Sequence, residues 1–355
     1  MNAITATSSE RKDPFDLLAL EQYLQQQIPG FSGPVTATRF KGGQSNPTYL
    51  LTTPARQYVM RAKPGPVAQL LPSAHAVERE FRLQSALAGS AVPVAGMHCL
   101  CEDESVIGRA FYVMDFIEGR IFWEQSLPGM EASERSAIYA ELNRVIAALH
   151  GVDFAVLGLA DYGKAGNYFA RQIDRWTRQY RASETVGIAA MDQLIEWLPQ
   201  HIPHEENPQV SLVHGDYRID NVIFHPTEPR ILAVIDWELS TLGHPLADFA
   251  YHMMSWHIAP GGAMRGLGGL DLAALGIPDE PAYIAAYEQR MGRQVAGDWN
   301  FYLAYNLFRI AAILQGIAKR VEEGTASSPQ AADYGRQARP LAELGWRFAQ
   351  QAGQS

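Results

Sequence analysis

The stretch that decides the fold reads VHGDYRIDN at residues 213–221 and continues, after a short connector, as ILAVIDWE at residues 231–238. Each block contains an apolar run that is followed by a carboxylate, Asp216 in the first block and Asp236 in the second. Such runs predict two strands, which we expect to be adjacent and to present both carboxylates to one cleft. Asn221 lies on the loop after Asp216, and the next apolar run would hold that loop in place.

This set of polar groups matches what phosphoryl transfer from ATP requires. The carboxylate of Asp216 can take the proton of an acceptor hydroxyl, while the oxygens of Asn221 and Asp236 can hold Mg²⁺. The sequence therefore predicts a kinase centre in which Asp216, Asn221 and Asp236 are catalytic, and in which Asn221 and Asp236 bind the metal ion.

The same residues carry a resemblance to a known family. The pattern His214-x-Asp216-x4-Asn221, with Asp236 after the next apolar strand, resembles aminoglycoside phosphotransferases and choline kinases. The wording HGDYRIDN followed by VIDWELSTLGHPLADFAY is most similar to the kinase-like part fused to acyl-CoA dehydrogenase domains in some eukaryotic enzymes. Two blocks in this order are far more specific than HxD alone. The resemblance implies a small-molecule kinase that uses ATP and Mg²⁺.

The composition limits the classes of function. The chain has 355 residues, of which 47% are hydrophobic, so it can bury a sizeable core. Its net charge of -9 argues against a nucleic-acid partner. We expect no membrane partner, because the N-terminus lacks a signal peptide and Asn306 and Arg309 interrupt the most apolar helix. Cys99 and Cys101 fit free thiols in a cytoplasmic protein. No pattern specifies the oligomeric state or the choice between ATP and GTP.

The order of the expected elements indicates an α+β, protein-kinase-like bilobal fold. We expect a small β-rich lobe over residues 13–116, a hinge at residues 117–119, and a larger, mainly helical catalytic and substrate lobe over residues 120–352. The small lobe would contain helices 13–28 and 74–88 and strands 35–41, 48–53, 57–63, 97–101 and 110–116. The large lobe would contain helices 131–150, 167–182, 188–198, 245–257, 280–291, 298–321 and 329–352.

Nucleotide contacts are expected in the small lobe. The loop between its first two strands holds two glycines, which would let the backbone approach a phosphate; an ordinary hairpin turn is the alternative. Residues 114–118 would form the adenine edge. The expected nucleotide-binding residues are Arg61, Glu80, Gly42, Gly43, Ser45, Asn46, Asp115 and Ile117.

A cation on the third strand is expected to contact the phosphates and to pair with a helix glutamate. Strand alternation places Arg61 and Lys63 on the same face. The family motif favours Arg61, whose forked guanidinium can grip phosphate oxygens, whereas Lys63 would extend to solvent. The choice between these two cations stays open. Glu80, rather than Glu78, occupies the position that the resemblance gives to the glutamate partner.

Several groups near the catalytic stretch invite a structural interpretation. The histidine-rich region could suggest a metallohydrolase, but it contains no HxH or HExxH pair. The resemblance implies instead that His214 braces the catalytic loop and that Asp248 steadies it. Trp237, large and apolar, is expected to pack under the metal site.

The acceptor is the least defined part of the prediction. Four arginines, Arg171, Arg175, Arg178 and Arg181, recur at helical spacing and form either a solvated face or a contact for an anionic substrate. The stretch at residues 255–275 is Gly-rich and apolar. We therefore expect a small-molecule hydroxyl substrate, such as a hydroxyacyl-CoA or a related acid. The alternatives are an aminoglycoside-type or other metabolite kinase, and a catalytically silent nucleotide-binding module of the same fold.

Overall fold

The computed structural model describes residues 15–40, 46–64, 76–164, 166–204, 209–262, 264–295, 298–326 and 330–353. Three residues of the expected phosphate loop, Gly42, Gly43 and Ser45, lie outside the described residues. The chain divides into two compact units. Unit 1 comprises Met1–Ile121, Ala155–Leu159 and Asn221–Leu239, and unit 2 comprises Phe122–Phe154, Ala160–Asp220 and Ser240–Ser355. The hairpin that carries Asp236 thus belongs to unit 1, although it follows the expected hinge in sequence.

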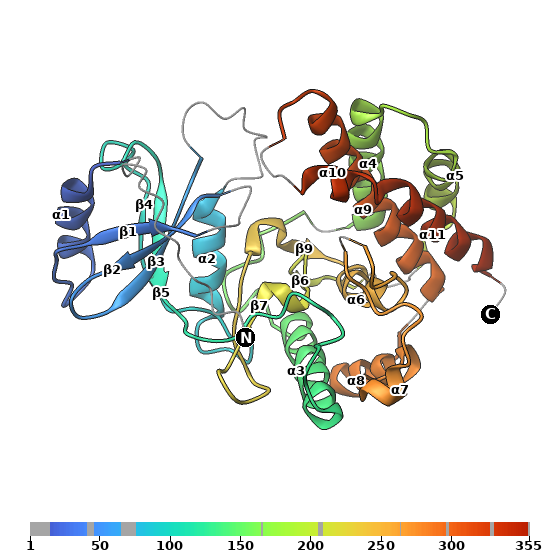
Figure 1. Cartoon of the computed structure of the whole chain (residues 1–355), viewed down its shortest axis with the longest axis horizontal. Coiled ribbons are helices and arrows are strands. Elements are labelled where there is room, and N and C mark those ends of the chain that lie inside the picture. The colour runs from blue at the N-terminus through green and yellow to red at the C-terminus, as the bar shows by residue number, and fades with distance from the viewer. Residues whose placement is uncertain are drawn as a thin grey trace. The chain divides into compact units, whose positions relative to one another are not determined.

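Unit 1 is built on a five-stranded antiparallel sheet with the strand order β1-β2-β3-β5-β4. Its strands are β1 (Thr36–Arg39), β2 (Thr48–Thr52), β3 (Gln57–Ala62), β4 (Met97–Cys101) and β5 (Phe111–Asp115). Figure 1 shows helices α1 (Leu17–Gln27) and α2 (Val77–Leu87) on opposite sides of this sheet. The small lobe therefore has the order of elements that the sequence predicts.

Each face of the sheet has its own apolar cluster. In β3, Tyr58 and Met60 alternate with their neighbours and pack with Leu20 and Leu24 of α1. The opposite face packs against α2, where Tyr112 lies in one cluster with residues of that helix. Because side chains of a strand alternate between the two faces, Arg61, which follows Met60, is directed to the α2 side. The face of the sheet that packs against α2 therefore also carries the polar side chain of Arg61.

A second, short hairpin in unit 1 carries the Asp236 block. It consists of β7 (Val222–Phe224) and β8 (Ile231–Val234), which pair with each other. The strand before Asp216, β6 (Ser211–Val213), pairs instead with β9 (Thr241–Gly243) in unit 2. The expectation that the two carboxylate-bearing strands are adjacent in one sheet is therefore wrong. The alternation of three-residue strands is too short to specify their partners.

The expected hinge runs into a close contact with β7. Arg120 forms an isolated antiparallel bridge with Phe224. A Cβ atom on Gly119 would lie 2.3 Å from the carbonyl oxygen of Phe224. Glycine is required at this position because the two backbones approach too closely for a side chain. Whether residues 117–119 act as a hinge stays a prediction.

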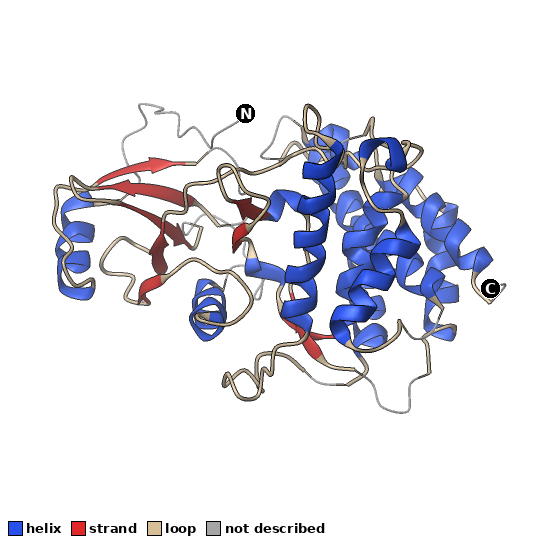
Figure 2. Cartoon of the chain, turned by 90° about the horizontal axis from the view of Figure 1, so that it is seen from below, coloured by secondary structure: helices blue, strands red, loops and turns tan. Residues whose placement is uncertain are grey.

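Unit 2 is mainly helical, and α9 (Trp299–Glu322) forms its centre, packed against α4, α6, α10 and α11. Figure 2 shows several helices side by side in the helical part of the chain. The other helices are α3 (Ala132–His150), α4 (Tyr168–Ser183), α5 (Ala189–Trp197), α6 (Pro245–Met253), α7 (Leu272–Leu275), α8 (Glu280–Met291), α10 (Ala331–Gly335) and α11 (Ala338–Gln351). The structure thus combines a small antiparallel sheet with a larger helical region, as the sequence predicts.

The apolar helix α9 is a core helix. By length and mean hydropathy, 1.3 over its most apolar window, it could cross a membrane, so the argument that its polar residues make it too mixed needs correction. However, 78% of that window is buried inside the structure. Burial within a helical bundle accounts for the apolar composition of such a helix.

Two expected helices end differently from the prediction. The helix expected over residues 329–352 is broken into α10 and α11. Pro340 lies in the first turn of α11, where its missing N–H is tolerated. The helix expected over residues 245–257 ends at Met253 and continues as one turn of 3-10 helix, Met254–Trp256.

Candidate active site

Arg61 is the centre of a buried charge cluster in unit 1. Its Nε lies 3.1 Å from Glu80 Oε2, which is the ion pair that the sequence predicts. Its Nη2 lies 2.9 Å from Asp236 Oδ1 and 3.2 Å from Glu238 Oε2. One guanidinium therefore connects β3, α2 and the residues after β8. Burial opposes the charge of Arg61, but Glu80, Asp236 and Glu238 outweigh it and hold its pKa above the ordinary value.

Glu80 is fixed by neutral donors as well as by Arg61. The Asn46 side chain donates to its Oε1 over 3.0 Å, and the Tyr112 hydroxyl donates to its Oε2 over 3.1 Å. Burial raises the pKa of Glu80, and these bonds together with Arg61 offset the rise only in part. Asn46, expected at the phosphates, is fully buried and uses its side-chain amide to hold Glu80. Its expected role toward a nucleotide stays a prediction.

Lys63, the second candidate cation, has a different environment from Arg61. It is paired with Glu78 of α2 and is half-buried, so the expectation that it extends freely to solvent is wrong. Lys63 forms an ion pair with Glu78 and Arg61 forms one with Glu80, so the two candidate cations have separate partners. Only Arg61 also contacts Asp236.

The open end of the β7–β8 hairpin, away from its turn, brings Asn221 next to Ile235, which precedes Asp236. Val222 pairs with Val234, and the Ile235 amide donates to the Asn221 carbonyl oxygen over 2.9 Å. Asp236 has a φ of 65°, a left-handed conformation that costs about 1–2 kcal/mol in residues other than glycine. Strained backbone of this kind concentrates at functional sites.

Trp237 anchors the strained residue, and its expected place under a metal site stays a prediction. It is 1% exposed, and its Nε1 donates to the Val234 carbonyl oxygen over 2.9 Å. With this anchor below it, Asp236 retains a partly exposed side chain that contacts Arg61. Asn221 and Asp236 both supply hard oxygen ligands. Carboxylate and amide oxygens are donors that Mg²⁺ prefers, so this pair fits the ion by its chemistry.

Asp115 and Ile117, which are expected to contact adenine, already make contacts within unit 1. The Asp115 side chain is bound by Arg56 over 2.5 Å and by His98 over 2.8 Å. Its backbone amide donates to the Gly96 carbonyl oxygen. Ile117 packs against a small cluster that includes Ile223 of β7. The roles of Asp115 and Ile117 toward adenine stay predictions, and the side chain of Asp115 already has a structural function.

In unit 2, the loop that carries Asp216 is held by Asp248 of α6. The carboxylate of Asp248 accepts the backbone amides of His214 over 2.7 Å and of Gly215 over 2.8 Å. It also contacts His150 Nε2 at 3.2 Å. Burial raises the pKa of Asp248, whereas the contacts with His150 and His214 lower it. The contacts have the larger effect, so the pKa lies below its ordinary value. The expectation that Asp248 steadies the loop is confirmed.

His214 braces the loop rather than facing a substrate. It is fully buried, and its Nδ1 accepts the backbone amide of Asp216 over 3.2 Å. The expected bracing contact is therefore present. Among the described residues, no group of three or more His, Cys, Asp or Glu side chains is arranged to hold a metal ion, so the histidine-rich region forms no such centre there.

The Asp216 carboxylate is oriented by two residues that the sequence analysis did not single out. The Tyr251 hydroxyl donates to Asp216 Oδ1 over 2.5 Å. Arg218 Nε lies 3.4 Å from the same oxygen, and its Nη2 donates to Asp220 Oδ2 over 2.8 Å. Arg218 lies within the quoted block and could have been found there. Tyr251 lies one helical turn after Asp248, on α6, and is the last residue of the second quoted block, which could have drawn attention to it.

A buried arginine completes the surroundings of the Asp216 loop. Arg309 of α9 donates through Nη2 to the Gly215 carbonyl oxygen over 2.6 Å. Its guanidinium lies over the Tyr251 ring, 4.9 Å from the centroid. The sequence analysis treated Arg309 only as a polar interruption of an apolar helix. The chemistry of unit 2 is therefore a carboxylate that can accept a proton, oriented by a tyrosine and surrounded by cations.

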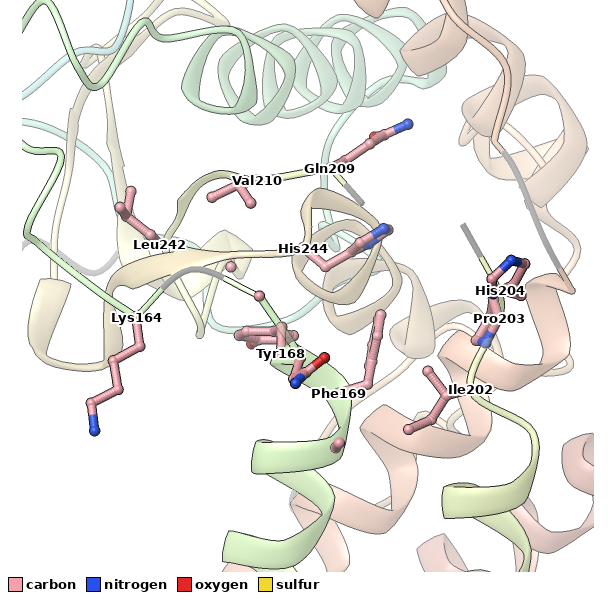
Figure 3. Close-up of a pocket in the computed structure, with 14 residues that line it drawn as sticks. Lys164, Tyr168, Phe169, Ile202, Pro203, His204, Gln209, Val210, Leu242 and His244 are labelled. Carbon is pink, nitrogen blue, oxygen red and sulfur yellow. The ribbon is translucent and has the colours of Figure 1, made fainter. Parts of the chain in front are cut away.

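Unit 2 also contains a cavity of about 290 Å³, shown in Figure 3. Tyr168 and Phe169 at the start of α4 lie on one side of it, and Ile202, Pro203 and His204 lie on another. None of the expected site residues lines this cavity. Tyr168 lines this cavity, and burial raises the pKa of its phenol. The positive charge of Arg309 lowers the same pKa, but by less than burial raises it.

Comparisons with known proteins agree on one family. The model of the phosphotransferase enzyme family matches residues 36–296. Mouse acyl-CoA dehydrogenase family member 10 is 47% identical over 337 residues, covering 94% of this chain and 31% of that protein. Mouse acyl-CoA dehydrogenase family member 11 is 41% identical over 340 residues, covering 94% and 43%. The chain therefore spans less than half the length of these relatives.

Solved structures give the same result. A Ralstonia eutropha protein, named as a candidate aminoglycoside phosphotransferase, is 64% identical, with a TM-score of 0.88 over 95% of this chain and 99% of that one. The choline kinase of Cryptosporidium parvum has a TM-score of 0.63 at 12% identity, covering 95% and 96%. A thermostable mutant of the aminoglycoside phosphotransferase APH(4)-Ia, with ADP and hygromycin B, has a TM-score of 0.60 at 16% identity, covering 93% and 98%. The last two share the fold.

Proposed function

This chain belongs to the phosphotransferase enzyme family, and on that premise we propose that it is a small-molecule kinase that phosphorylates a hydroxyl of an acidic metabolite. The observation that carries the proposal is the arrangement around Asp216. A carboxylate with a defined orientation sits on a loop whose backbone is tied to Asp248. A nucleotide-binding module without chemistry has no use for such a carboxylate.

Asp216 is the proposed general base. As the acceptor oxygen bonds to the γ-phosphorus of ATP and the bond from that phosphorus to the bridging oxygen breaks, the acceptor proton passes to the Asp216 carboxylate, and ADP leaves. The hydrogen bond from Tyr251 to Oδ1 orients the carboxylate that takes this proton. Arg218, beside the same carboxylate, adds positive charge where the transferred group carries negative charge.

Unit 1 supplies the residues proposed for the nucleotide. Asn221 and Asp236 would hold Mg²⁺, which neutralises phosphate charge when it is bound. Arg61, fixed by Glu80, is the proposed phosphate contact. The use of ATP is supported by the APH(4)-Ia structure, which contains ADP, and the adenine contacts at residues 114–118 remain part of the proposal.

The acceptor is proposed to be a hydroxyacyl-CoA or a related hydroxy acid. The relatives of known name are acyl-CoA dehydrogenase family members, whose kinase-like part corresponds to this chain. Within unit 2, Arg309 and the ring of Tyr251 lie beside the Asp216 loop together with the carboxylate of Asp248, and the arginine favours an anion over a polycation.

The test incubates the purified chain with Mg-ATP and single acceptors, and detects phosphorylated products by mass spectrometry. The panel contains 3-hydroxybutyryl-CoA, free hydroxy acids, choline and kanamycin. We expect transfer to a hydroxyacyl compound and none to kanamycin. Efficient transfer to kanamycin, with none to any hydroxyacyl compound, would refute the proposed acceptor class. Absence of transfer from ATP to every acceptor would refute the kinase assignment.

A further inference from the structure

Two arginines of unit 2 share one aromatic residue. The guanidinium of Arg309 lies 5.5 Å from the Trp176 ring centroid, and that of Arg175 lies 5.0 Å from the same centroid. These cations come from α9 and α4, which pack against each other. Two like charges on one indole repel each other, and the interaction with Arg309 adds to burial in lowering the pKa of Arg175. An anion bound beside these cations would relieve this repulsion.

Arg309 is a buried cation whose pKa is held above its ordinary value by Tyr305, Tyr168, Tyr251 and Asp216, against the effect of burial. It is 6% exposed, and in the part of the chain that the structure describes no carboxylate oxygen forms an ion pair with it. Its contacts are the Gly215 carbonyl oxygen and the rings of Trp176 and Tyr251. Buried charges are costly unless they are paired, and one carbonyl oxygen satisfies few of the five donors of a guanidinium. An anionic group would add hydrogen-bond acceptors for this guanidinium.

The other arginines of α4 have partners of their own. The contacts are Arg171 Nη2 to the Lys164 carbonyl oxygen (2.6 Å), Arg178 Nη2 to Asp174 (2.7 Å), and Arg181 Nη1 to Asp192 (2.7 Å). Arg178 is a typical solvated residue, with 72% of its side chain exposed. The stripe that the sequence shows thus separates into three arginines with ordinary partners and one, Arg175, that faces Trp176.

The position of this pair links it to the reaction. Arg309 lies over the ring of Tyr251, whose hydroxyl binds Asp216. We propose that Arg175 and Arg309 form an anion-binding subsite that holds a carboxylate or phosphate of the acceptor while its hydroxyl is presented to Asp216. The subsite rests on the proposed kinase function and specifies its substrate class. It selects hydroxylated acids and rejects polyamines, because two guanidiniums repel an ammonium group.

The test measures binding to the full chain by isothermal titration calorimetry. The anionic probes are inorganic phosphate, 3-hydroxybutyrate and 3-hydroxybutyryl-CoA, and 3-hydroxybutyramide is the uncharged counterpart. Arg175→Gln removes the charge, Arg175→Lys restores it, and Arg178→Gln is the matched control on the same helix. Arg175 is chosen rather than Arg309 because it makes no contact with the Asp216 loop, so the loop stays intact.

We expect Arg175→Gln to weaken binding of 3-hydroxybutyrate about tenfold, which corresponds to about 1.4 kcal/mol, with partial rescue by lysine. The neutral amide and the Arg178→Gln variant should show no such change. A response limited to the CoA ester would assign the bound anion to its phosphates, which also supports the subsite. Unchanged binding of every anionic probe, no binding of any of them, or an equal loss for the amide would overturn it.

Activity separates this inference from the proposed function. If charge-dependent binding is observed but no phosphoryl group is transferred from ATP, the kinase proposal fails and the subsite stands. If an anionic acceptor is phosphorylated with the same KM in the wild type and in Arg175→Gln, the subsite fails and the kinase proposal stands.

Discussion

Asp216 is positioned by residues from several distant segments of unit 2. Its backbone amide is bound by His214, and the two preceding residues are bound by Asp248. Its side chain accepts the Tyr251 hydroxyl. Each contact fixes a different part of the residue, so the carboxylate has little freedom to rotate. Orientation of a base to within a fraction of an ångström is worth a large factor in rate.

Tyr251 tests whether this orientation matters. In Tyr251→Phe the carboxylate loses its 2.5 Å hydrogen bond while the ring and its packing remain. Because a hydrogen bond to a charged group is worth about 1.5–3 kcal/mol, we expect kcat to fall roughly ten- to a hundredfold. The KM for ATP should stay unchanged, since Tyr251 is not assigned to the nucleotide. Steady-state kinetics at several ATP concentrations measure both; a loss confined to KM would contradict the orienting role.

Arg61 and Lys63 can be distinguished by a pair of substitutions. Arg61→Lys keeps the charge, but a single ammonium cannot reproduce the fork that contacts Glu80 and Asp236. We expect Mg-ATP to bind about tenfold more weakly, by analogy with the loss of one charge-assisted hydrogen bond. Lys63→Ala removes only the partly exposed pair with Glu78, worth about 0–1 kcal/mol, and should leave Mg-ATP binding unchanged. If calorimetry shows that Lys63→Ala causes the larger loss, the phosphate contact belongs to Lys63.

At the scale of the elements, the sheet of unit 1 follows from local pattern. The order and type of β1 to β5 and α2 agree with the sequence because alternating β-branched and aromatic residues specify strands. The pairing of β6 with β9 did not follow, since Thr241–Gly243 is too short to show any alternation. Such a strand is defined by its partner rather than by its own residues.

The site was predictable where the residues lie close together in sequence. Asp216 and Arg218 share one block, and Asp236 follows an apolar strand. Tyr251 and Arg309 belong to helices and reach the Asp216 loop only through packing. Tyr251 ends the second quoted block and Arg309 lies in an apolar helix, but neither position shows its contact with the loop until the chain is folded.

Gly119 tests the contact between the segment after β5 and β7. In Gly119→Ala the new Cβ would lie 2.3 Å from the Phe224 carbonyl oxygen, and backbone atoms cannot move aside as a flexible side chain would. We expect the free energy of unfolding to fall by about 1–3 kcal/mol. Gly187→Ala is the control, because its nearest neighbour is a flexible Glu184 oxygen at 3.6 Å. Equal stability of both variants in denaturant titrations would contradict the described contact.

At the scale of the whole molecule, the stability of the chain depends on ionisable groups buried in unit 2. His252 is 2% exposed, and its Nε2 contacts the Tyr283 hydroxyl at 2.9 Å. Burial lowers its pKa from 6.5 to about 4. Its neutral form is therefore part of the folded state. As the pH falls below 6.5, the unfolded chain binds a proton that the folded chain does not bind until about pH 4.

The stability contributed by this histidine should be fully present above pH 6.5 and should be lost as the pH falls toward 4. The expected decrease in the free energy of unfolding over this window is up to about 3 kcal/mol. His252→Gln keeps a hydrogen-bonding group toward Tyr283 and cannot titrate, so its decrease should be smaller by that amount. Chemical denaturation of both proteins at pH 7, 6, 5 and 4.5 measures the difference. Parallel curves would exclude the contribution of His252.

The central claim is that the whole chain transfers a phosphoryl group with Asp216 as the base. The most direct measurement compares the wild type with Asp216→Asn, following both Mg-ATP binding and product formation, with Asp174→Asn as a control on an exposed carboxylate. An amide keeps the shape of the side chain but cannot take the proton. The account predicts unchanged Mg-ATP affinity and a rate of transfer lower by about 10²–10⁴ in Asp216→Asn, with full activity in Asp174→Asn. Full phosphoryl transfer by Asp216→Asn would contradict it.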